Sequence, residues 1–103
     1  MNPRTPVVVG VGQVLNRSKD LDDAIEPIEM MLKAIYRAEE DSGARLLDQV
    51  GSVRVIRGIW DYGNPAGFIA ERIGSSDSET MGTLFGGNQV QAVLNRSCLD
   101  ILS

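Results

Sequence analysis

With 103 residues, of which 43% are hydrophobic, the chain is long enough for one small domain or for a piece of a larger protein. Its net charge of -4 and its scattered lysines and arginines exclude a typical nucleic-acid-binding surface. The single cysteine, Cys98, excludes an internal disulfide, and the apolar runs are too short for a signal sequence or a membrane span, so we expect a cytoplasmic protein.

The first predicted element is a strand over residues 6–12. Its sequence, PVVVGVG, is a β-branched run between proline and glycine, which is typical of a strand buried on both faces in a parallel sheet. The glycines do not match a dinucleotide-binding turn, because position 15, where that motif needs a third glycine, is leucine. We therefore interpret Gly10 and Gly12 as positions of close packing.

A helix is predicted to begin near Pro27 and to end at Gly43. Acidic residues precede the proline, which suits a helix N-terminus, and glycine is common just past the last turn. The apolar stripe of this helix is Ile25, Ile28, Leu32 and Ile35. A second strand is predicted over residues 50–58, where β-branched and polar residues alternate. The order strand, helix, strand indicates a right-handed parallel unit and therefore an α/β fold.

Three further elements follow. Asn64 and Pro65 predict the N-cap and first position of a short helix that runs to Gly74. A third strand is predicted over residues 80–85 and a third helix over residues 90–102. The whole pattern is strand-helix-strand-helix-strand-helix.

The third predicted helix is apolar around most of its circumference. Its apolar residues are Val90, Val93, Leu94, Cys98, Leu99, Ile101 and Leu102. A helix of this kind is typically buried centrally, yet three strands and three helices are too few to surround it. We therefore expect residues 1–103 to be the N-terminal segment of a larger α/β protein, or to need a partner that covers this surface.

The junction before this helix consists of Gly86, Gly87 and Asn88. Free N–H groups and the positive end of the helix dipole converge at such a point and could stabilise an oxyanion or a thiolate. The alternative is a tight turn with Asn88 as N-cap, which the residues alone favour. Trp60 and Tyr62, which follow the second predicted strand, either line a ligand pocket or pack over the edge of the core.

Groups for acid-base and metal chemistry are scarce in this sequence, which contains no histidine. Neither a Cys-His pair nor a Ser-His-Asp triad can therefore form within the chain, and Cys98 is expected to act as a small apolar residue. The acidic runs over residues 20–23 and 39–41 lack the glycine and the spacing of a calcium loop. We expect no metal site.

Five stretches, in this order, resemble the N-terminal part of the thiolase superfamily: TPVVVGVGQ, EPIEMMLKAIYRAEEDSG, VGSVRVIRG, NPAGFIAERIG and TMGTLFGGNQVQAVLNRSCLDI. They are most similar to its acetyl-CoA acetyltransferase-like branch, which is related to the sterol carrier protein thiolases. Aligning Gln91 and Ala92 with a Gln-Ala pair of the family places Gly86 at the position of the family's nucleophilic cysteine. Cys98 lies more than three helical turns farther along and cannot replace that nucleophile.

The resemblance implies a thiolase-like fold that is incomplete in this segment, with an acyl-CoA thioester as substrate and no other cofactor. It implies acyl transfer or a cysteine-independent cleavage of a carbon-carbon bond; the alternative is a non-catalytic subunit or scaffold. The family's acid-base groups come from a C-terminal half, so a homodimer, that C-terminal half or an accessory subunit is the expected partner. The resemblance places four residues near the dimer interface: Thr80, Met81, Thr83 and Phe85.

Overall fold

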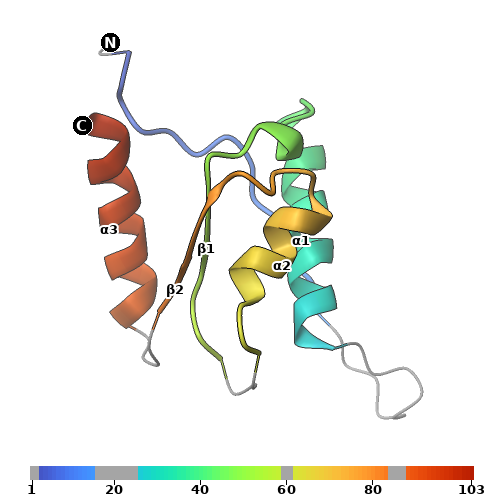
Figure 1. Cartoon of the computed structure of the whole chain (residues 1–103). Coiled ribbons are helices and arrows are strands. Elements are labelled where there is room, and N and C mark those ends of the chain that lie inside the picture. The colour runs from blue at the N-terminus through green and yellow to red at the C-terminus, as the bar shows by residue number, and fades with distance from the viewer. Residues whose placement is uncertain (1–2, 16–25, 59–61, 84–87) are drawn as a thin grey trace.

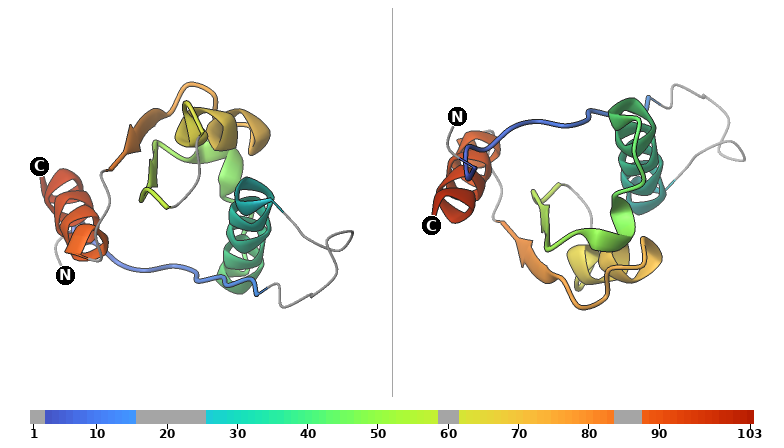
Figure 2. Two further views of the ribbon diagram at one scale, coloured as in Figure 1. Left: turned by 90° about the horizontal axis from the view of Figure 1, so that it is seen from below. Right: turned by 90° about the horizontal axis from the view of Figure 1, so that it is seen from above.

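A small parallel sheet lies between helices in the computed structural model of the chain, which describes residues 3–15, 26–58, 62–83 and 88–103 (Figure 1). The elements in chain order are α1 (Pro27–Ser42), the short 3-10 helix η2 (Leu47–Gln49), β1 (Ser52–Val55), α2 (Pro65–Arg72), β2 (Glu79–Gly82) and α3 (Asn88–Leu102). Strands β1 and β2 are parallel, with Ser52 opposite Glu79 and Val55 opposite Gly82. Helices α1 and α2 lie on one side of the sheet and α3 on the other (Figures 1 and 2). The α/β prediction is confirmed.

The ends of α1 follow from its sequence. Pro27 occupies the first turn, where its missing N–H costs no hydrogen bond, and Gly43 ends the helix with a φ of 74°. Of the predicted apolar stripe, Ile28 and Leu32 are buried and Ile35 packs against the core. Ile25 lies outside the described residues.

Helix α2 also begins as predicted. Asn64 is its N-cap, and the side-chain Oδ1 accepts a hydrogen bond from the N–H of Gly67 at 3.1 Å. The buried face of α2 carries two alanines, Ala66 and Ala70, whose small side chains let the helix approach the sheet closely.

The hydrophobic core lies between these two helices and one face of β1. Its buried residues are Ile28, Leu32, Val53, Val55, Ala66, Ile69, Ala70 and Ile73. Because side chains alternate along a strand, Val53 and Val55 enter this core while Ser52 and Arg54 face the other way, toward α3. The core thus occupies one side of the sheet only.

The predicted strand over residues 6–12 is not formed. Residues 3–15 run from near the C-terminal end of α3 to α1 (Figures 1 and 2), and Val7, Val8, Val9 and Val11 are between 62% and 76% exposed. Side chains of α1 bind two backbone groups of this segment, one on Val11 and one on Gln13. The N–H of Val11 donates to Asp41 Oδ2 at 3.0 Å, and Arg37 Nη1 donates to the carbonyl oxygen of Gln13 at 2.7 Å.

Gly10 and Gly12 explain how this segment lies so close to α1. A Cβ atom on Gly10 would collide with the carbonyl oxygen of Ala38, and a Cβ on Gly12 with that of Ala34. The predicted close packing is therefore present, but against a helix instead of within a sheet.

Helix α3 has the predicted position, and its apolar surface is largely open in this chain. None of its described residues is buried, and Leu99 is 62% exposed. From the sequence we expected the elements of residues 1–103 to be too few to surround this helix, and in the structure other elements approach α3 from one side only (Figure 2). That another part or partner covers its apolar surface stays a prediction. Among the described residues, no helix is long and apolar enough to cross a membrane.

Candidate functional site

The carboxyl ends of β1 and β2 meet at one edge of the sheet, because the strands are parallel. A cavity of about 120 Å³ opens at this edge. It is lined by Val55, Arg57, Tyr62, Gly63, Pro65, Gly82 and Thr83. Open α/β sheets bind their ligands at this end of the strands. The edge is therefore the candidate functional site.

Thr83 ties the two strand ends together at this cavity. Its N–H donates to the carbonyl oxygen of Val55 at 3.1 Å, and its Oγ1 accepts from the N–H of Arg57 at 3.2 Å. The parallel pairing thereby continues one residue beyond β2. The position of the cavity wall is fixed by backbone contacts from both strands.

Tyr62 joins this cavity to a second one. The phenolic oxygen accepts a hydrogen bond from the N–H of Ile28 at 3.4 Å, in the first turn of α1, where backbone N–H groups have no partner within the helix. The second cavity, of about 300 Å³, is lined by Glu26, Ile28, Glu29, Tyr62, Gly63, Asn64, Pro65 and Phe68. Tyr62 also packs against the core, and its predicted role in lining a ligand pocket stays a prediction. Trp60 lies outside the described residues.

The charges around the two cavities differ in sign. Arg57 lines the first cavity, whereas Glu26 and Glu29 line the second. Glu29 pairs with Arg72 at 3.8 Å, and the guanidinium of Arg72 lies 5.4 Å from the centre of the Phe68 ring. In the described part of the chain, no group of three or more His, Cys, Asp or Glu side chains could hold a metal ion.

The predicted glycine junction falls between two described segments. Gly86 and Gly87 lie outside the described residues, as does Phe85. Helix α3 includes Asn88 as its first residue, and this side chain is exposed, so the predicted N-cap position lies one residue inside the helix. Residues 84–87 join Thr83 to Asn88, so α3 begins within reach of the candidate site.

Three of the residues predicted for a dimer interface are described, and all lie on or next to β2. Thr80 is exposed, whereas Met81 and Thr83 are half-buried. The sheet order is β1-β2, so within the described residues the outer edge of β2 has no neighbouring strand. An open edge of this kind can pair with another chain. The dimer interface itself stays a prediction.

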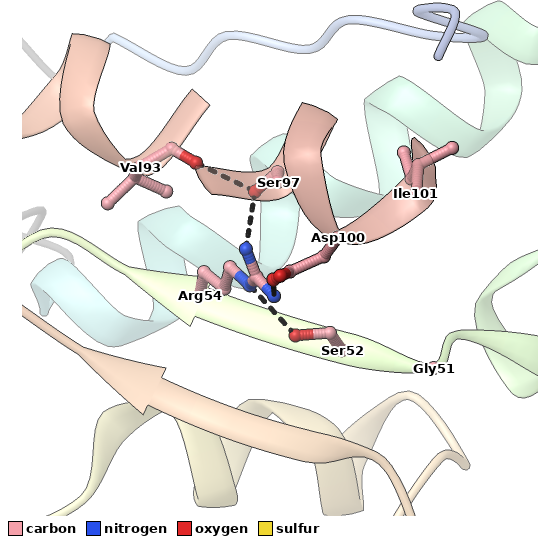
Figure 3. Close-up of a pocket in the computed structure, with 7 residues that line it drawn as sticks. All are labelled: Gly51, Ser52, Arg54, Val93, Ser97, Asp100 and Ile101. Carbon is pink, nitrogen blue, oxygen red and sulfur yellow. Dashed lines mark hydrogen bonds and ion pairs between the residues drawn. The ribbon is translucent and has the colours of Figure 1, made fainter. Parts of the chain in front are cut away.

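A cluster of polar side chains lies between β1 and α3, away from the candidate site (Figure 3). The sequence analysis did not single it out. The guanidinium of Arg54 donates from Nε to Ser52 Oγ at 3.0 Å and from Nη1 to Ser97 Oγ at 2.8 Å. Its Nη2 binds Asp100 and lies 3.5 Å from Glu79 Oε1. The sequence contained one signal for this cluster. Arg54 stands between Val53 and Val55, so it lies on the face of the strand opposite to these two valines.

The Arg54 cluster borders a cavity of about 600 Å³, lined by Gly51, Ser52, Arg54, Val93, Ser97, Asp100 and Ile101. Hydrogen bonds from Arg54 lower the pKa of Asp100, and the positive charges of Arg96 and Arg54 add to this. The polar groups of this cluster are engaged with one another. We therefore assign it to the docking of α3 and not to the candidate site.

No protein-family model and no curated protein matches the chain. Among solved structures, the chain is similar to the crystal structure of a monomeric SCP2-thiolase-like protein type 1 from Mycobacterium smegmatis, with a TM-score of 0.79 and 26% sequence identity. The match covers 97% of this chain and 21% of that one. The α/β fold of the chain is thus that of an SCP2-thiolase-like protein, which supports a thiolase-like relationship. The chain spans about a fifth of the length of the protein that it matches.

Proposed function

We propose that the protein acts on acyl-CoA thioesters, as part of a thiolase-like enzyme of the acetyl-CoA acetyltransferase-like branch. The observation that carries this proposal is the structural match to an SCP2-thiolase-like protein over 97% of the chain. The cavities at the carboxyl ends of β1 and β2 add to it, since this edge is where a ligand is expected in an α/β protein.

The glycine at position 86 decides between two kinds of chemistry. Acyl transfer of the thiolase type needs a sulfur nucleophile, and the alignment on Gln91 and Ala92 leaves Gly86 in its place. Cleavage of a carbon-carbon bond needs instead a base and donors that stabilise a thioester enolate, and no acyl-enzyme. The resemblance places the acid-base groups of the family in a C-terminal half, so we propose that the base comes from that half. We favour the cysteine-independent reaction.

Tyr62 and Arg57 are the side chains that we assign to substrate binding. Tyr62 borders both cavities and would contact the acyl or thioester end of the substrate. Arg57 lines the smaller cavity together with Tyr62, and its guanidinium could donate hydrogen bonds to a carbonyl oxygen of the ligand. Because the two side chains line one cavity, they would contact neighbouring parts of the same ligand.

Calorimetric titration with acetyl-CoA tests this assignment. Replacing Tyr62 by alanine should weaken binding about tenfold, a loss that is ordinary for a truncated aromatic contact. The matched control is Tyr36→Ala, since Tyr36 is the other tyrosine of the chain, is exposed, and lies on α1 outside both cavities. Equal affinities of the two variants would contradict the proposed site, and no binding by the unmodified chain would contradict the proposed substrate.

Mass spectrometry after incubation with acetoacetyl-CoA tests the reaction class. We expect no covalent acyl adduct on the protein, because position 86 carries no thiol. Robust thiolysis through an acyl-enzyme would overturn the cysteine-independent reading.

The exposed apolar surface favours a second candidate, a non-catalytic thiolase-like subunit that scaffolds a partner. Val7, Val8, Leu94 and Leu99 are all at least half exposed. A chain that binds no coenzyme A thioester but co-purifies tightly with another subunit would support this candidate. Light scattering, which gives the molar mass in solution, tests the homodimer expected from the sequence. The similar solved structure is that of a protein described as monomeric.

A further inference from the structure

Arg54 stands at the centre of the interface between β1 and α3. Its side chain is only 10% exposed, and its guanidinium points from the strand toward the helix (Figure 3). Two of its partners, Ser97 and Asp100, lie on α3, and the other two, Ser52 and Glu79, lie on the sheet. One side chain therefore holds groups from three elements.

Apolar burial contributes little to the docking of α3. None of its described residues is buried, and the hydrophobic core is formed by α1, β1, α2 and Ile73. Val93 and Ile101 line the cavity beside the Arg54 cluster without closing it. At the end of the chain, Arg4 Nη1 donates to the carbonyl oxygen of Ser103 at 2.8 Å in an exposed contact, where solvent weakens its contribution.

The charges of the cluster balance in pairs. Arg54 and Arg96 are positive, whereas Glu79 and Asp100 are negative. Asp100 lies between the two arginines, since its Oδ1 accepts from Arg96 Nε at 3.1 Å and its Oδ2 binds Arg54. Loss of the Asp100 charge would leave two cations, one on the helix and one on the strand, with no carboxylate between them.

We infer that Arg54 is a latch that docks α3 on the sheet, and that α3 detaches as one unit when the latch is broken while the core stays folded. The helix is joined covalently to β2 at its N-terminal end, so a contact farther along is needed to fix its direction. Arg54 supplies that contact at Ser97 and Asp100, in the C-terminal half of α3. A detached helix of 15 residues is only marginally stable in water, so release should unfold it.

Hydrogen exchange followed by mass spectrometry on the full chain tests this latch. In Arg54→Met, which keeps the volume but removes the charge and the donors, we expect the amides of α3 to exchange at least about tenfold faster. The amides of α1 should be unchanged, because its contacts lie in the core. Arg54→Lys, which keeps the charge but loses the planar fork, should give an intermediate rate.

The matched control is Arg72→Met, because Arg72 is an exposed arginine on α2 whose ion pair with Glu29 measures 3.8 Å. It should leave α3 exchange as in the unmodified chain. Asp100→Asn, a milder change on the helix side, should accelerate α3 in the same direction as Arg54→Met. Unchanged α3 exchange in Arg54→Met would overturn the latch, and so would an equal loss of protection in α1 and α3, which would mean that the two sides unfold together.

Discussion

The two faces of the sheet are covered in opposite ways. On one face, α1 and α2 bury a continuous apolar core against Val53 and Val55. On the other, α3 is joined through the guanidinium of Arg54, whose side chain is 10% exposed, and keeps most of its apolar side chains exposed. Helix α3 is thus the least buried of the three helices, although apolar residues cover most of its circumference. Apolar content indicates that a helix needs a partner, but only the arrangement of the other elements decides whether this chain supplies it.

The largest expected effect is the difference in stability lost when an apolar side chain is truncated on one face or on the other. Leu32→Ala, at a side chain 2% exposed, should lower the free energy of unfolding by about 2–5 kcal/mol, because it leaves a cavity in the core. Leu99→Ala, at a side chain 62% exposed on α3, should change it by at most about 0.5 kcal/mol. Urea denaturation of the two variants measures both values. Similar losses would show that α3 is packed as tightly as α1.

A smaller effect is expected where residues 3–15 lie on α1. Gly12→Ala would drive a Cβ into the carbonyl oxygen of Ala34 and should cost about 1–3 kcal/mol, as overpacking usually does. Gly51→Ala is the control, since a Cβ there would meet open space. Denaturation midpoints provide the comparison. A Gly12 variant as stable as the Gly51 variant would contradict the close packing of this segment.

The smallest expected effects concern pH, because among the described residues each face has one carboxylate whose pKa is lowered. On the core side, backbone N–H groups of Leu47 and Leu46 hold the pKa of Glu39 below its usual value, with Oε2 at 2.9 and 2.8 Å. On the other side, Arg54 lowers the pKa of Asp100. A lowered pKa stabilises the folded state above the ordinary values, about 4.3 for Glu and 3.9 for Asp, and this contribution is lost as the pH falls through the lowered values.

Glu39→Gln and Asp100→Asn separate the two carboxylates. Glu39→Gln should reduce overall stability at pH 7, and its stability should converge with that of the unmodified chain as the pH falls through the lowered pKa of Glu39, as measured by urea denaturation. Asp100→Asn should instead remove the acid-induced loss of protection in α3, as measured by hydrogen exchange relative to α1. If both substitutions acted on α1 and α3 alike, the two faces would not be independent.

Local signals in the sequence predicted most of the elements. Pro27 and Gly43 bracket α1, and Asn64 and Pro65 begin α2, because caps act through neighbouring backbone groups. Both strands were predicted, although each is shorter than expected. The fold class followed from their order.

Long-range contacts account for what the sequence did not predict. The valines of residues 6–12 have strand propensity, but the segment lies on α1, where Asp41 binds the N–H of Val11 and Arg37 binds the carbonyl oxygen of Gln13. Arg54 reads locally as the solvent-facing residue of a strand, and its role depends on Ser97 and Asp100 more than forty residues later. At the candidate site, Tyr62 was predicted as a lining residue, whereas the contribution of Thr83 to the cavity required the parallel register.

The position of Cys98 has a practical consequence. It is the only cysteine of the chain, it is a free thiol of intermediate exposure, and it lies on α3. A maleimide fluorophore would therefore mark this one helix without any substitution elsewhere. The anisotropy of that dye would report the tumbling of α3 separately from that of the core, in a single cuvette and in real time.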